Sequence, residues 1–137
     1  METEPKITQA YIVPGTVKLI YRHLLQLGDG SVRTAEASEC AADQGKFWPM
    51  HDALFAHQPH LEVPELRGYA VELQLDLVRY DQEMNGRVYV PRIRKDIEGG
   101  RESGARSTPT FFVNGRICDV SYDLKALFAA VEAVLRQ

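Results

Sequence analysis

The eight residues from Thr108 to Gly115 constrain the fold of this chain more than any other stretch. A Thr-Pro pair comes first, the apolar segment Phe111–Val113 follows, and Asn114 precedes the final glycine. Aromatic and β-branched residues favour strands, and Asn-Gly is a strong signal for a two-residue hairpin turn. An X-Pro bond also gives up most of the preference for the trans form. The run therefore predicts a constrained loop in which the proline can be cis, then a buried strand and a tight turn.

Hydrophobic periodicity and breaker residues divide the rest of the chain into further elements. Segment 17–24 is apolar on both alternating faces, which is typical of a strand covered on both sides. Strands at 110–114 and 116–120 should form an antiparallel hairpin. Caps, prolines and apolar spacing predict helices at about 3–11, 31–43 with Ser31 as N-cap, 46–57, from Pro64, 76–85 with Asp76 as N-cap, 91–102, and from Ser121 onward. This order predicts an α/β chain with a helical insertion and partly parallel pairing of its first strand.

Length and charge exclude several classes of function. A chain of 137 residues fits one domain, and 45% hydrophobic with 26% charged residues is an ordinary globular composition. A net charge of −3 gives no electrostatic support for nucleic-acid binding. No apolar run approaches the about 18 residues that a membrane-spanning helix needs. The first residues lack the basic and apolar regions of a signal peptide, so the compartment stays undetermined.

Several stretches of the chain resemble the DsbA-like thioredoxin family. The residues that carry this resemblance are Glu4-Pro5, Val17–His23, Ala37–Ala41, Gln44–Trp48, His51-Asp52, Leu75-Asp76, Val90, Asp96, Gly100, Gly104 and Thr108–Gly115. The resemblance implies one thioredoxin-like domain over residues 1–137 with a helical insertion at about 31–104. It also implies dithiol–disulfide exchange on protein substrates, with Thr108 and a cis Pro109 beside the substrate backbone. Ser107, where the family usually has glycine, departs from the pattern.

The large departure is at the front of the chain. The family has a first strand that runs into C-x-x-C at a helix N-terminus, where the helix dipole stabilises the thiolate. Both features would lie before Met1, and the only cysteines here are Cys40 and Cys118. We therefore expect no catalytic residue, no cofactor, no metal site and a redox-inactive chain. If the true N-terminus is longer, the resemblance suggests an extracytoplasmic oxidoreductase. The alternatives are a non-enzymatic peptide-binding or assembly module that keeps the cis-proline groove and, ranked last, a glutathione-dependent relative.

The remaining reactive side chains have plainer interpretations. Cys40 falls among alanines inside a helix, which indicates a small buried residue. Cys118 either packs in the core or pairs with Cys40, which requires Cα atoms within about 7 Å. Three histidines, at 51, 57 and 60, are not spaced for one helical face, so we do not expect them to bind a metal together. Asp76 and Asp96 are interpreted as a helix cap and a surface or helix-end charge.

The missing strand also bears on association. In the thioredoxin arrangement that strand lies between the counterparts of segments 17–24 and 110–114. Unpaired backbone groups inside a sheet cost about 1–3 kcal/mol each, and open edges recruit other chains. The two strands can close on each other, another copy can supply a segment, or the chain can stay partly unfolded. We expect a homodimer formed by strand or helix exchange.

Overall fold

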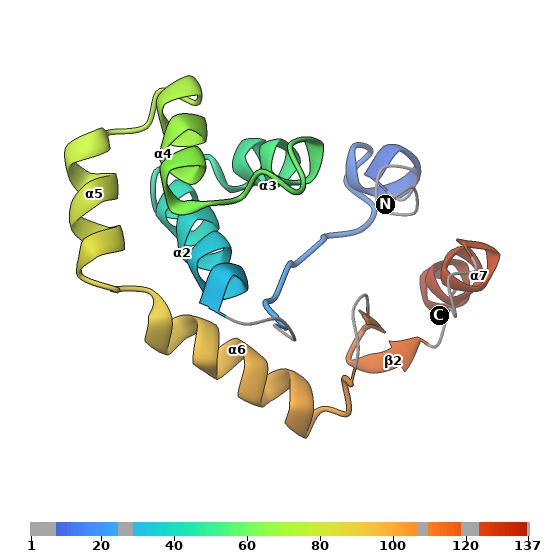
Figure 1. Cartoon of the computed structure of the whole chain (residues 1–137). Helices are drawn as coiled ribbons and strands as arrows, with labels where there is room; N and C mark the ends of the chain where they lie inside the picture. Colours follow the sequence, from blue (N-terminus) through green and yellow to red (C-terminus); the bar gives the residue numbers. More distant parts are fainter. Residues whose placement is uncertain (1–7, 25–28, 107–109, 119–123, 137) are drawn as a thin grey trace. The chain divides into compact units, whose positions relative to one another are not determined.

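The computed structural model describes residues 8–24, 29–106, 110–118 and 124–136 (Figure 1). The chain divides into two compact units. One comprises Met1–Arg22 with Gly100–Gln137, and the other is the continuous segment His23–Gly99. No helix among the described residues combines the length and the apolar character that crossing a bilayer requires.

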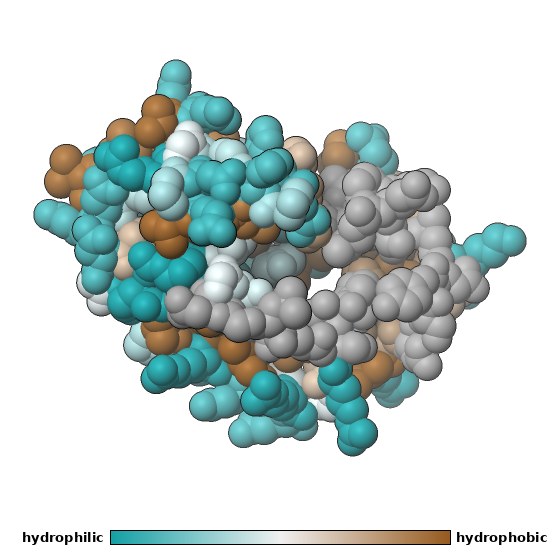
Figure 2. All heavy atoms as spheres, in the orientation of Figure 1, coloured by the Kyte–Doolittle hydropathy of each residue, from teal (hydrophilic) through white to brown (hydrophobic). Residues whose placement is uncertain are grey.

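The unit His23–Gly99 is built from helices that gather around a central one. These are α2 (Asp29–Asp43), α3 (Phe47–Ala56), α4 (Val63–Glu72), α5 (Leu77–Asn85) and most of α6 (Val90–Glu102) (Figure 1). Helix α2 contacts α3, α4 and α5. The core side chains include the fully buried Met50, Leu66 and Ile93. Burying each of them contributes about 1.5–3 kcal/mol. On the face drawn in Figure 2, the described surface over these helices is largely hydrophilic, with separate hydrophobic spots.

Local sequence signals set most of these helix boundaries as predicted. Pro64 lies in the first turn of α4, behind a capping box made by Glu62 and Glu65. Asp76 caps α5, because its carboxylate accepts a hydrogen bond from the Arg79 amide at 3.2 Å. The prediction that Ser31 caps the helix after segment 17–24 is wrong. Helix α2 already begins at Asp29, so Ser31 lies inside the helix.

The other unit contains a hairpin and the C-terminal helix. A π-helical turn, η1 (Thr8–Ile12), comes first, and β1 (Phe111–Val113), β2 (Arg116–Cys118) and α7 (Leu124–Leu135) complete it. The strands pair antiparallel with Phe111 opposite Cys118, Phe112 opposite Ile117 and Val113 opposite Arg116. Asn114 and Gly115 both have positive φ, 49° and 81°, as a type I′ turn requires. The hairpin prediction is confirmed where the structure describes it. The expected helix cap, Ser121, lies outside the described residues.

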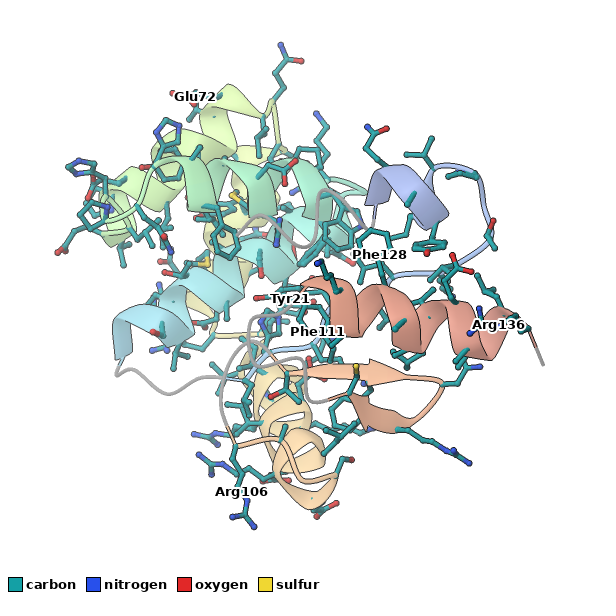
Figure 3. The ribbon with its side chains drawn as sticks, turned by 90° about the vertical axis from the view of Figure 1, so that its right-hand side faces the viewer. Tyr21, Glu72, Arg106, Phe111, Phe128 and Arg136 are labelled. Carbon is teal, nitrogen blue, oxygen red and sulfur yellow. The ribbon has the colours of Figure 1, made fainter. Side chains whose placement is uncertain are left out.

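A small apolar core holds the hairpin against α7. Tyr11, Leu127 and Val131 are buried there, and Phe111, Val113 and Cys118 pack partly buried against them. Figure 3 shows α7 running alongside the two strands, with Phe111 and Phe128 labelled. The inner face of the hairpin therefore belongs to the core. The prediction of a buried strand is wrong for Phe112, which is 40% exposed because successive side chains of a strand point to opposite faces.

The predicted strand at 17–24 is absent. The segment from Lys18 to Leu24 has no regular secondary structure, and the sheet among the described residues is β1 with β2 alone. A strand requires a neighbouring strand for its N–H and C=O groups, and in the described sheet β1 and β2 pair with each other. Ile20 and Tyr21 are 60% and 44% exposed, so the expected burial on both faces is also wrong. Direct closure of this segment on residues 110–114 does not occur in the described sheet.

Candidate functional site

The predicted substrate-binding residues Thr108 and Pro109 lie outside the described residues. Their setting is nonetheless defined on both sides. Helix α6 ends in a glycine C-cap, because Gly104 has φ +97° and the Ala105 amide donates to the Gly100 carbonyl at 2.8 Å. On the other side, Phe111 begins β1. In sequence, the Thr-Pro pair thus lies between the end of α6 and the first hairpin strand.

The glycine at this helix end also touches the hairpin. A Cβ atom added to Gly104 would meet Ile117 Cδ1 at 3.0 Å, and its positive φ already disfavours any other residue. This contact lies within the unit that contains the hairpin. The end of α6 at Gly104 is therefore set by both backbone conformation and packing. The cis peptide bond among the described residues is Gln58–Pro59, so the prediction of a cis Pro109 stays a prediction.

Neither cysteine lies at a helix N-terminus, since Cys40 is in the last turn of α2 and Cys118 is on β2. Cys40 is a buried free thiol on α2. Burial, together with the negative charges of Glu83 and Glu36, raises the pKa of Cys40 from its ordinary 9.0 to about 12. Such a thiol stays protonated at neutral pH and is a poor nucleophile. Cys118 is half-buried on β2 beside the α7 core. The interpretation of Cys40 as a small buried residue agrees with its burial.

A group of polar side chains, of which His23 and Glu39 are buried, lies at one side of α2 within the helical unit. His23 Nε2 lies 2.9 Å from Glu39 Oε1, and Arg92 Nη1 donates to Glu39 Oε2 at 2.9 Å. Asp96 completes the group, because its Oδ2 accepts from the His23 backbone N–H at 3.2 Å. His23 is 5% exposed and Glu39 9%. We call these four residues the His23–Glu39 cluster.

Hydrogen bonds to the Glu39 carboxylate dominate the electrostatics of this cluster. The hydrogen bond from His23, and then that from Arg92, hold the pKa of Glu39 below its ordinary value despite the opposing effect of burial. Arg92 also lies over the ring of Tyr89, 5.1 Å from its centroid, which fixes the guanidinium in place. The carboxylate of Glu39 is thus ionised and bonded on both oxygens. The arrangement connects α2, α6 and the segment that precedes α2.

Three residues of the same cluster carry side-chain atoms that could together bind a metal ion. One ligand atom each from His23, Glu39 and Asp96 lies within 4.8 Å of the others. One imidazole and two carboxylates are a set that suits zinc or manganese. Arg92, however, already supplies positive charge to Glu39, and a cation would have to bind beside it. The contacts therefore describe a self-sufficient ion-pair network more directly than a metal site.

The histidines singled out in the sequence do not come together. His51 Nδ1 lies 3.1 Å from Asp52 Oδ1, His57 stacks on Tyr69 with centroids 4.8 Å apart, and His60 Nδ1 lies 3.5 Å from Glu65 Oε2. Each belongs to a separate local contact. The expectation that they do not bind a metal together stays a prediction.

Sequence reasoning missed the His23–Glu39 cluster, because Asp96 was interpreted only as a surface or helix-end charge. Asp96 is partly buried and bonded to the His23 backbone. A usable signal was present, since Glu39 falls in the alanine-rich face of α2 and a buried carboxylate needs a partner. The partners are 16 and 53 residues away in sequence, so spacing alone does not reveal them.

Fold and site together define a thioredoxin-like class: a hairpin packed on a C-terminal helix, preceded by a helical segment. The chain belongs to the thioredoxin family, whose model matches residues 1–133. Its fold is also that of oxidised BdbD from Bacillus subtilis, with a TM-score of 0.86 at 23% identity over 97% of this chain and 76% of that one. The predicted fold, DsbA-like thioredoxin with a helical insertion, is confirmed.

Curated relatives place similar sequences inside much longer proteins. The chain is 41% identical over 132 residues to Na(+)/H(+) antiporter NhaA 1 of Salinispora arenicola, which covers 95% of this chain and 20% of that protein. It is also 41% identical over 120 residues to Na(+)/H(+) antiporter NhaA of Herminiimonas arsenicoxydans, with 88% and 19% covered. The chain therefore spans about a fifth of the length of these relatives.

Proposed function

We propose that these 137 residues form a redox-inactive polypeptide-binding module of the thiol-disulfide oxidoreductase-like type, built as one domain with a helical insertion at about 31–104. The arrangement of the cysteines carries this proposal. Dithiol exchange needs an exposed thiolate with a second thiol within one helical turn. Cys40 is buried and protonated, and Cys118 is 78 residues further along. The binding surface would be the Thr108–Pro109 loop between α6 and β1.

The test of redox inactivity is an insulin-reduction assay together with oxidation of a reduced model peptide. We expect both rates to stay at background for the wild type and for Cys40→Ser and Cys118→Ser. Turnover in the wild type that either serine variant abolishes would contradict the proposal. It would also make that cysteine part of an active pair.

Peptide binding is tested separately, with a fluorescent, cysteine-free extended peptide titrated onto the protein. Thr108→Arg should weaken binding at least tenfold, because the larger charged side chain blocks the loop. Val78→Arg is the matched control, since Val78 is 70% exposed on α5 and lies in the other unit. Equal effects of both substitutions would contradict a binding surface at the loop.

A second candidate function comes from the antiporter relatives. We propose that the module also regulates or assembles with a Na(+)/H(+) antiporter, because two such proteins contain a segment 41% identical to this chain. Reconstituted Na(+)/H(+) exchange in liposomes, with and without the purified chain added to an NhaA-type antiporter, tests this. A change in exchange rate that saturates with the chain supports it, and an unchanged rate contradicts it.

A further inference from the structure

We propose that the outer edge of β1 pairs with β1 of a second copy of this chain, so that two hairpins form one continuous antiparallel sheet. This goes beyond the proposed binding function, because it concerns the backbone edge of β1 rather than Thr108 and Pro109. It also names a defined partner, a second copy of this chain. The inference rests on the hydrogen-bonding direction of one residue, Phe112, on the composition of β1, and on the exposure of one hairpin face.

The register shows which backbone groups point outward. Asn114 and Gly115 form a two-residue type I′ turn, in which the flanking pair, Val113 and Arg116, is hydrogen-bonded. Antiparallel pairs alternate, so Phe112 and Ile117 form the non-hydrogen-bonded pair. The N–H and C=O of Phe112 therefore point away from β2. Among the described residues no strand pairs with this outer edge.

The edge of β1 also lacks the usual protection. Exposed edge strands normally carry a charged residue, a proline or a bulge that prevents pairing with another chain. From Thr110 to Asn114 the chain has none of these, and Phe111–Val113 has high strand propensity. Strand β2, in contrast, begins with the exposed Arg116. Of the two edges of this hairpin, β1 is thus the one suited to recruit a strand.

The side chains favour an identical partner. Phe112 and Ile117 form the outer face of the hairpin and are 40% and 47% exposed, while Phe111 and Val113 pack toward α7. A two-fold axis at Phe112 would place the two Phe112 residues opposite each other and let them exchange both backbone hydrogen bonds. A strand without charge meets its own copy without like-charge repulsion. The two outer faces would then join into one apolar surface.

A three-residue edge is short, so the dimer should be weak and concentration-dependent. Sedimentation equilibrium over a broad concentration series measures it. Phe112→Lys, which puts a charge on the edge strand, should weaken association at least tenfold. Ile117→Lys is the matched control, because it charges the same face on β2 rather than on the edge of β1. We expect it to reduce association no more than about twofold.

Amide hydrogen exchange keeps the proposal testable even if one variant unfolds. In the wild type, exchange at the Phe112 amide should slow as concentration rises, while the Ile117 amide, which faces the other edge, should not change. The proposal is wrong if the protein stays monomeric at all concentrations. It is also wrong if both lysine variants weaken association equally, because the two copies would then associate through the outer faces of their hairpins and not through the edge of β1. It is also wrong if the Phe112 amide is already protected in the monomer.

Discussion

Glu36 provides the sharpest test of how the helical unit is held together. Its side chain is 2% exposed on α2, and both carboxylate oxygens are bonded. Arg33 Nη1 donates to Oε2 at 3.1 Å, and Arg87 Nε donates to Oε1 at 2.8 Å. Arg33 also donates to the Met84 carbonyl at 3.0 Å. This buried carboxylate therefore connects α2 to the end of α5 and the turn that follows it.

The expected cost of Glu36→Gln follows from what each arginine can do afterwards. Removing one partner of a buried ion pair typically costs about 3–5 kcal/mol. Arg87 is 44% exposed and regains water, whereas Arg33 is 14% exposed and keeps the Met84 carbonyl and at most the single, uncharged amide oxygen of the glutamine. We therefore expect a loss of about 2–3 kcal/mol in the free energy of unfolding. Arg87→Met should cost about 1 kcal/mol, because Glu36 retains Arg33.

The assay is urea unfolding followed by the fluorescence of Trp48, the single tryptophan, which lies on α3 in the same unit. With a slope of about 1–3 kcal/mol per molar urea, Glu36→Gln should lower the midpoint by about 0.7–3 M. Glu98→Gln, an exposed substitution on α6, is the control and should stay within about 0.5 kcal/mol. A loss below about 0.5 kcal/mol for Glu36→Gln would refute this account of the ion pair.

Three further predictions concern single side chains. Asp76→Ala should destabilise the helical unit by about 1 kcal/mol through loss of the N-cap, measured by the same unfolding assay, and Asp76→Asn should restore most of it. Because the pKa of Glu39 is lowered on folding, its contribution is present above the ordinary pKa of 4.5 and lost as pH falls below it. The stability difference between wild type and Glu39→Gln should therefore shrink in acid; a constant difference would contradict this. Cys40 should resist alkylation by iodoacetamide at neutral pH until urea unfolds the protein, as followed by mass spectrometry; rapid labelling of folded protein would refute its burial.

Sequence alone predicted the elements whose signals are local. Asp76 as a cap, Pro64 in a first turn and Asn114-Gly115 as a hairpin turn each depend on neighbours within four residues, and the structure shows all three. The strand predicted at 17–24 is absent because residues with high strand propensity form a strand only where another strand supplies hydrogen bonds. No local pattern reports whether such a partner is present.

The candidate site was less accessible to sequence reasoning for a related reason. His23, Glu39 and Arg92 meet through the packing of α2 against α6 and the preceding segment, so their contacts are set by tertiary structure. The chemistry of Cys40 could be anticipated from its alanine-rich surroundings, but the magnitude of its pKa change required the burial seen in the structure. Resemblance supplied Thr108 and Pro109, which still await a direct test.

The small side chains on α2 limit which residues the buried positions of this helix can accept. Ala37, Cys40 and Ala41 are fully buried where α2 meets its neighbouring helices. Their low volume sets the distance between helix axes, and a larger residue would force the helices apart at a cost of about 1–3 kcal/mol. Cys40 fits this position as one more small side chain. Its sulfur therefore fills space between the helices, as the alanine methyl groups beside it do.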